Sequence, residues 1–173
     1  MKGLILYYSK TGFTKRYATW LQEDLGWDCL PFEERAKVEL SQYDGVVFGS
    51  SLRAGSIRKL SWLKKQLPGL SGKRVAVFFT GAMGPDEKAI AQCVEKNFTR
   101  EELSQVQPFY LWGGMNYESM AGLDKWMMSV FRKMLASKKN PAQEDKLAAQ
   151  MVAASFDKAD RKYLAPLEEY LTR

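Results

Sequence analysis

The sequence predicts an α/β fold in which helices cover both faces of a parallel β-sheet. Two observations lead to this fold class: five short apolar segments follow one another along the chain, and segments with helical periodicity alternate with them. The apolar segments are rich in Val, Ile, Phe and Tyr without strict alternation, which is typical of strands covered on both sides. We expect these strands at 3–9, 27–32, 43–51, 73–81 and 107–114.

The helices expected between and after these strands are marked by start and stop signals. Gly26 follows the last periodic residue of the first helix, as a C-terminal glycine does. Ser56 is the expected N-cap of the second helix. From such signals we expect helices over 12–26, 56–68 and 86–98, with a final helix within 160–173.

The chain of 173 residues fits one domain, 1–173, with a helical insertion at about 115–158, because the segment after the fifth strand is longer than a closing helix needs. The apolar opening turns polar too early for a signal peptide, and no apolar run is long enough to span a bilayer. We therefore expect a cytoplasmic protein.

Composition excludes several classes of function. The chain has no histidine, which removes the commonest metal ligand and the usual base of a nucleophilic triad. Its two cysteines, Cys29 and Cys93, have no metal-ligand spacing, so no metal site is expected. The net charge of +6 suits an anionic partner, but no nucleic-acid-binding motif accompanies it.

The loop after the first strand, "SKTGFT", carries the first candidate site. Backbone N–H groups and hydroxyls at a helix start can surround a phosphate, and the loop matches neither G-x-x-x-x-G-K-[ST] nor G-x-G-x-x-G. An ordinary capped turn is the alternative. The candidate phosphate-binding residues are Ser9, Lys10, Thr11, Gly12, Phe13 and Thr14.

The loops after the third and fourth strands carry the other candidate residues. Ligands of open parallel sheets bind beyond the carboxyl ends of the strands, and small residues there let a flat ring approach the backbone. Solvated turns are again the alternative for each loop by itself. The candidate ring-binding residues are Ser50, Ser51, Leu52, Arg53, Ala54 and Gly55 after the third strand, Thr80, Gly81, Ala82, Met83 and Gly84 after the fourth, and Gly113 after the fifth.

The combination of loops resembles the flavodoxin-like FMN proteins. "YYSKTGFTKRYATWL" is similar to their phosphate signature T-x-T-G-x-T, with Ser9 at its first position and Thr11, Gly12 and Thr14 at the others. The resemblance implies a doubly wound five-stranded sheet of order 2-1-3-4-5. It also implies FMN at the junction of strands one and three, with its phosphate in the 9–14 loop.

Within this family, "FGSSLRAGSIRKLSWL" and "LWGGMNYESMAGLDKWMMSVFRKM" resemble the menaquinone-dependent protoporphyrinogen oxidase branch. The ring loops lack the stacking Tyr or Trp that flavodoxins commonly have, and the chain is basic where typical flavodoxins are acidic. Because the chemistry would belong to the flavin, we name no catalytic residue of the protein.

The segment 123–139 predicts an amphipathic helix with two interpretations. Its apolar residues recur at steps of three and four, with Lys and Arg on the remaining faces, which is the pattern of a helix at a membrane surface. The same pattern suits a helix that packs on its own domain or on a second subunit. The apolar residues are Leu123, Trp126, Met127, Val130, Phe131, Met134 and Leu135.

The function expected from these observations is an FMN-dependent oxidoreductase that passes electrons from a reduced small molecule, such as protoporphyrinogen IX, to a quinone. The alternatives are an electron-transfer flavodoxin for protein redox partners and an FMN-fold binding module without redox activity. Monomer and homodimer are equally compatible with the sequence, as is peripheral contact of 123–139 with the inner face of a membrane.

Overall fold

The computed structural model describes residues 1–120, 122–143, 145–146, 149 and 154–173. Its centre is a parallel sheet of order β2-β1-β3-β5-β6, which confirms the predicted fold class and strand order. The numbering differs from the expected 2-1-3-4-5 because a short hairpin strand, β4, follows β3. The parallel strands are β1 (Gly3–Tyr7), β2 (Asp28–Pro31), β3 (Gly45–Arg53), β5 (Arg74–Gly81) and β6 (Val106–Trp112).

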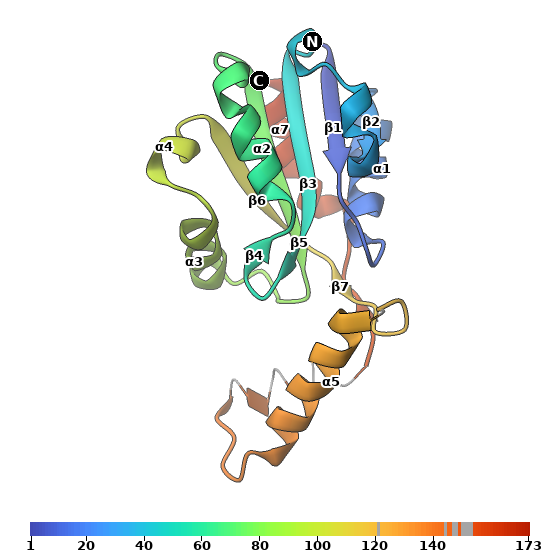
Figure 1. Cartoon of the computed structure of the whole chain (residues 1–173), viewed down its shortest axis with the longest axis vertical. Coiled ribbons are helices and arrows are strands. Elements are labelled where there is room, and N and C mark those ends of the chain that lie inside the picture. Colours follow the sequence, from blue (N-terminus) through green and yellow to red (C-terminus); the bar gives the residue numbers. More distant parts are fainter. Residues whose placement is uncertain (121, 144, 147–148, 150–153) are drawn as a thin grey trace.

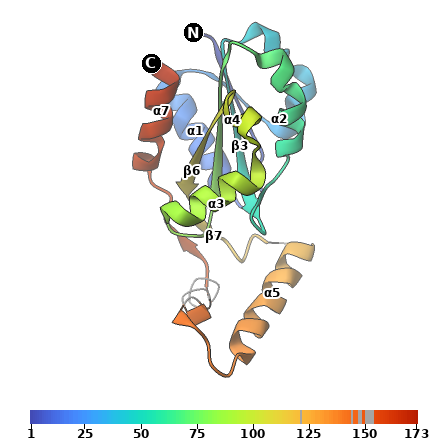
Figure 2. The same cartoon turned by 90° about the vertical axis from the view of Figure 1, so that its left-hand side faces the viewer.

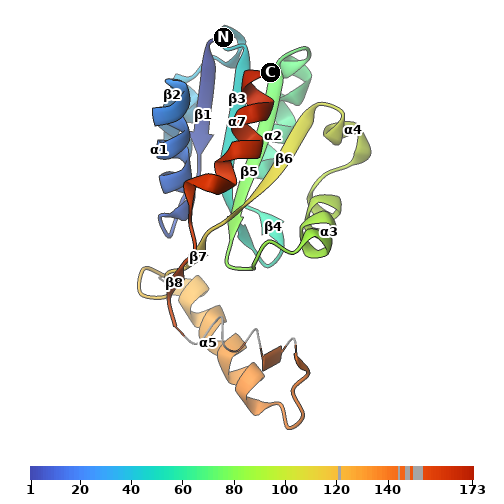
Figure 3. The ribbon, with the colours of Figure 1, turned by 180° about the vertical axis from the view of Figure 1, so that it is seen from behind.

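Helices cover both faces of the sheet (Figure 1). One face carries α1 (Phe13–Leu25) and α7 (Ala165–Thr172), which lie in front in Figure 3. The other carries α2 (Leu60–Gln66), α3 (Glu87–Asn97) and the short α4 (Arg100–Leu103). Short 3-10 helices lie at Phe32–Lys37, Leu40–Gln42, Leu67–Leu70 and Arg161–Leu164.

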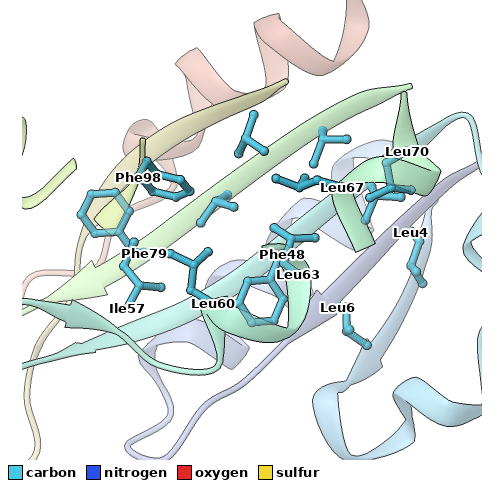
Figure 4. Close-up of a cluster of buried hydrophobic side chains, with 14 of the residues drawn as sticks. Leu4, Leu6, Phe48, Ile57, Leu60, Leu63, Leu67, Leu70, Phe79 and Phe98 are labelled. Atoms are coloured by element: carbon cyan, nitrogen blue, oxygen red, sulfur yellow. The ribbon is translucent and has the colours of Figure 1, made fainter. Parts of the chain in front are cut away.

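The core has two parts, one on each face of the sheet. Figure 4 shows the part under α2, which includes Phe48 and Phe79 of neighbouring strands and Leu63 of the helix, all three with no exposed surface. Strand side chains point alternately to opposite faces, so Phe78 belongs to the other part, under α1 and α7. A sheet buried on both sides explains why its strands are continuously apolar in sequence.

Glycines bound the first helix as expected. Gly12 precedes α1 with φ 95°, and Gly26 ends it with φ 66° and an N–H that donates to the carbonyl of Gln22 at 2.8 Å. Both backbones are left-handed, the region that glycine occupies without strain. The start of α3 also matches the prediction, because the Asp86 carboxylate caps it by accepting the N–H of Ala89 at 2.7 Å.

The expected cap at Ser56 was wrong. Ser56 lies in β4 (Ser56–Ile57), which turns back antiparallel to β3 through a turn at Ala54 (φ 50°) and Gly55 (φ 75°). Helix α2 therefore starts only at Leu60, after Lys59. The sequence signal was ambiguous because a serine before an apolar residue fits both a helix cap and a hairpin strand.

The insertion after β6 leaves the sheet at the carboxyl ends of its strands. A two-stranded stem, β7 (Gly114–Met115) paired with β8 (Phe156–Asp157), carries it, and α5 (Gly122–Ser137) stands away from the sheet in Figures 1, 2 and 3. This confirms an insertion and a helix where 123–139 predicts one. Of the expected insertion, residues 121, 144, 147–148 and 150–153 lie outside the described part.

Candidate functional site

The loop between β1 and α1 presents unsatisfied hydrogen-bonding groups. No side chain caps the N-terminus of α1, and its first turn contains no acidic residue. The hydroxyl of Ser9 is buried without a hydrogen-bond partner among the described residues. A Cβ built on Gly12 would meet no atom within 4 Å, so space is open beside the helix end. Free backbone donors, an orphan hydroxyl and open space fit a phosphate group.

Thr14 contributes differently from what the sequence suggested. Its side chain is 1 % exposed and its hydroxyl lies 2.9 Å from that of Thr80, which is also buried. This hydrogen bond joins the first turn of α1 to the end of β5. Thr14 therefore ties the phosphate loop to the neighbouring loop of the sheet instead of presenting a free hydroxyl.

A cavity of about 460 Å³ opens at the carboxyl ends of β1, β3, β5 and β6. It joins the three loops that sequence analysis selected separately, because parallel strands end at the same edge of the sheet. The predicted residues that line it are Lys10, Thr11, Phe13, Ser51, Leu52, Arg53, Ala54, Thr80, Gly81, Ala82 and Gly113.

The other predicted residues do not line this cavity: Ser9, Gly12, Thr14, Ser50, Gly55, Met83 and Gly84. Ser50 is fully buried and its hydroxyl donates to the carbonyl of Arg58 at 2.6 Å, because alternation in β3 turns it away from the side that Ser51 faces. Gly55 and Met83 line a separate depression beside α3. Ser9 and Gly12 belong to the phosphate loop described above.

Aromatic residues of β6 fix the loop after β5. The indole N–H of Trp112 donates to the carbonyl of Ala82 at 3.3 Å, and the hydroxyl of Tyr110 donates to that of Met83. The N–H of Gly113 donates to the carbonyl of Gly81 at 3.0 Å. The backbone groups of this loop are therefore held in place before a ligand arrives.

Asp124, at the start of α5, joins the insertion to the cavity. Its carboxylate accepts a hydrogen bond of 2.7 Å from Arg58 and lies 2.8 Å from Nε of Arg53. The hydrogen bond from Arg58 lowers the pKa of Asp124, and the positive charges of Arg58, Arg53 and Lys10 lower it further. The guanidinium of Arg53 also contacts the sulfur of Met127 at 3.3 Å.

Sequence reasoning missed the far wall of the cavity. The cavity continues from the loops onto the insertion, where most of the lining is apolar. The insertion residues that line it are Gly114, Met115, Asn116, Met120, Asp124, Met127, Met128 and Phe131, and Arg58 lines it from the segment after β4. The methionine-rich composition of the insertion was the available signal, but composition does not say which side of α5 faces the sheet.

The thiols lie away from this chemistry. Cys93 is buried and Cys29 half-buried, and burial raises the pKa of Cys93 and raises that of Cys29 to about 11. Within the described ranges, no group of three or more His, Cys, Asp and Glu side chains is placed to hold a metal ion. Nor is any helix in those ranges long and apolar enough to cross a bilayer.

Residues 4–142 match the flavodoxin domain family, so the chain belongs to that family. Membership makes FMN the cofactor of the site, as the loop resemblance implied. No curated protein matches the sequence significantly.

Several solved structures are distantly similar, and two of them illustrate the likeness. One is a flavoprotein in complex with FMN from Lactobacillus acidophilus, 20% identical, covering 64% of this chain and 91% of that one with a TM-score of 0.42. The other is a flavodoxin, WrbA-like protein from Agrobacterium tumefaciens, 12% identical, covering 63% and 82% with a TM-score of 0.41. The family assignment therefore rests on the domain match.

Proposed function

We propose that this protein is an FMN-dependent oxidoreductase that takes electrons from a reduced small molecule, of which protoporphyrinogen IX is the first candidate, and passes them to a quinone. The observation that carries the proposal is the continuity of the cavity. It extends from the cofactor loops onto the inner side of α5, where Met127, Met128 and Phe131 offer an adaptable apolar wall. We infer that a second flat, apolar molecule contacts this wall.

The charges at this wall suit a substrate with acidic groups. Arg53 and Arg58 share the single carboxylate of Asp124, and Lys10 lines the same cavity. The local balance is therefore positive. When bound, FMN supplies the electron-accepting chemistry, while the protein binds and orients the reactants and excludes water from between them.

The first experiment is the visible absorption spectrum of the purified protein after reconstitution with FMN, followed by anaerobic turnover with protoporphyrinogen IX and a water-soluble menaquinone analogue. We expect flavin bands, release of FMN in equimolar amount, and turnover that depends on both substrates. Bound FMN that a flavodoxin reductase reduces, without any quinone turnover, would identify an electron carrier instead. Failure of the protein to bind FMN would contradict both the oxidoreductase and the electron carrier, and would favour a non-redox binding module.

A pair of variants on α5 tests where the second substrate binds. Phe131→Ser alters the cavity wall, and we expect it to raise KM for the quinone analogue with little effect on the Kd for FMN. Trp126→Ser makes a comparable change on the same helix, but Trp126 lies outside the cavity and is 63% exposed. It should leave both the KM for the quinone analogue and the Kd for FMN unchanged. Equal effects of the two variants would place the substrate elsewhere.

A further inference from the structure

Helix α5 carries an apolar stripe that faces away from the domain. Leu123, Trp126, Val130 and Met134 follow one another at steps of three and four, so they share one face of the helix. Their exposed fractions are 61%, 63%, 46% and 50%. Apart from Met1, all the large apolar residues that are exposed in the described part of the chain belong to α5.

The stripe is distinct from the side of α5 that contacts the rest of the protein. Asp124 binds Arg53 and Arg58, and Leu135 is buried in a small cluster with Met115. Phe131, Met127 and Met128 line the cavity. The intramolecular contacts of the helix therefore lie along one edge of its apolar face, and the stripe at the other edge of that face is left exposed to solvent.

Charge around the stripe is basic. Lys125 and Lys133 are exposed on α5, and Lys139 lies two residues after its end. Lys138 also follows the helix, but its charge is paired with Asp145 at 2.6 Å. The helix itself has one carboxylate, Asp124, which the two arginines hold on the inner side. The whole chain has a net charge of +6. An apolar stripe that contains Trp and is flanked by lysines complements a surface whose outer layer is negatively charged and whose interior is apolar.

We propose that α5 docks this protein on an anionic lipid surface, with the stripe of Leu123, Trp126, Val130 and Met134 in the headgroup layer and the flanking lysines at the lipid phosphates. The stripe is short and the helix does not span the bilayer, so attachment is peripheral. This surface goes beyond the proposed redox function and does not depend on it.

A second copy of the chain fits the stripe less well than lipid does. In a two-fold antiparallel pairing centred on the stripe, residues at equal distances from its midpoint oppose each other, which brings Lys125 of one copy toward Arg132 of the other. Opposed cations repel, and the only carboxylate of the helix is already engaged on the inner side. Anionic lipid supplies the missing negative charge.

The test is co-sedimentation of the FMN-reconstituted protein with vesicles of phosphatidylcholine alone or mixed with phosphatidylglycerol. We expect binding to the mixed vesicles, weak binding to phosphatidylcholine, and release by high salt. The double variant Trp126→Ser/Val130→Ser should lose at least tenfold in vesicle affinity. Its melting temperature and FMN affinity should stay unchanged, since both side chains are exposed.

A charge-matched pair of variants separates a specific surface from general basicity. Lys125→Glu/Lys133→Glu changes α5, whereas Lys65→Glu/Lys88→Glu makes the same change of net charge at exposed positions on α2 and α3. We expect only the α5 pair to abolish vesicle binding. Equal losses of vesicle affinity in the two double variants, or unchanged vesicle affinity in both, would overturn the proposal. So would vesicle-independent dimerisation that Trp126→Ser/Val130→Ser disrupts.

Discussion

Asp124 and Arg58 form a hydrogen-bonded ion pair of 2.7 Å that connects the first turn of the insertion helix to the strand hairpin beside the cavity. The two residues are 66 positions apart in sequence. Arg53 binds the other oxygen of the same carboxylate at 2.8 Å. One carboxylate therefore ties the first turn of α5, on the far wall of the cavity, to two arginines.

Replacement of Asp124 tests this connection. Asp124→Asn keeps the size of the side chain and removes its charge, so we expect α5 to detach more often and limited proteolysis within 122–137 to become severalfold faster. Asp145→Asn is the control, because Asp145 pairs with Lys138 elsewhere in the insertion. If both variants are cleaved at the wild-type rate, packing rather than the ion pair holds the helix.

Acid should release the same contact. The pKa of Asp124 is lowered by its arginines, so the stabilisation is complete above the ordinary value of 3.8 and is lost as pH falls through the lower folded value. The charged groups that face Asp124 are Arg53, Arg58 and Lys10. Amide hydrogen exchange of α5, corrected for the intrinsic pH dependence, should accelerate below 3.8. Asp124→Asn should lack this acceleration.

Ser9 should affect the free and the FMN-bound protein in opposite ways. Its buried hydroxyl has no partner among the described residues, so Ser9→Ala should raise the free energy of unfolding of the FMN-free protein by about 1 kcal/mol. The increase in melting temperature on adding FMN should become smaller, because a phosphate contact is lost. Ser50→Ala is the contrast. The Ser50 hydroxyl donates a hydrogen bond to the backbone carbonyl of Arg58, so its removal should destabilise the FMN-free protein. A destabilised Ser9→Ala protein would contradict the unpaired hydroxyl.

Thr14 and Thr80 should be energetically coupled. Each single change to valine leaves the other hydroxyl buried without its partner, which costs about 1–3 kcal/mol. The double variant removes both hydroxyls and should lose less than the sum of the two single losses, by about 0.5–3 kcal/mol. Urea denaturation of the four FMN-free proteins measures this coupling. Additive losses would mean that the two hydroxyls do not share a hydrogen bond.

The sequence alone determined the order of the five parallel strands, their approximate positions and the loops that the cavity joins. Strands buried on both faces must be continuously apolar, so their periodicity could be detected locally. Gly12 and Gly26 marked the ends of α1 because a left-handed backbone favours glycine. The family signature in the 9–14 loop depends on local sequence in the same way, and it led to FMN.

Tertiary structure alone decided which side chains those loops present and what faces them. Thr14 points to Thr80, and Ser50 to the backbone of Arg58, because the pleat of a strand and the pitch of a helix set directions that residue type does not encode. Asp124 meets Arg53 and Arg58 only in the folded protein, where the start of α5 lies beside the hairpin of β3 and β4. The amphipathic pattern of α5 showed that it has an apolar face, whereas the position of Asp124 and Leu135 decided that Trp126 and Val130 stay exposed.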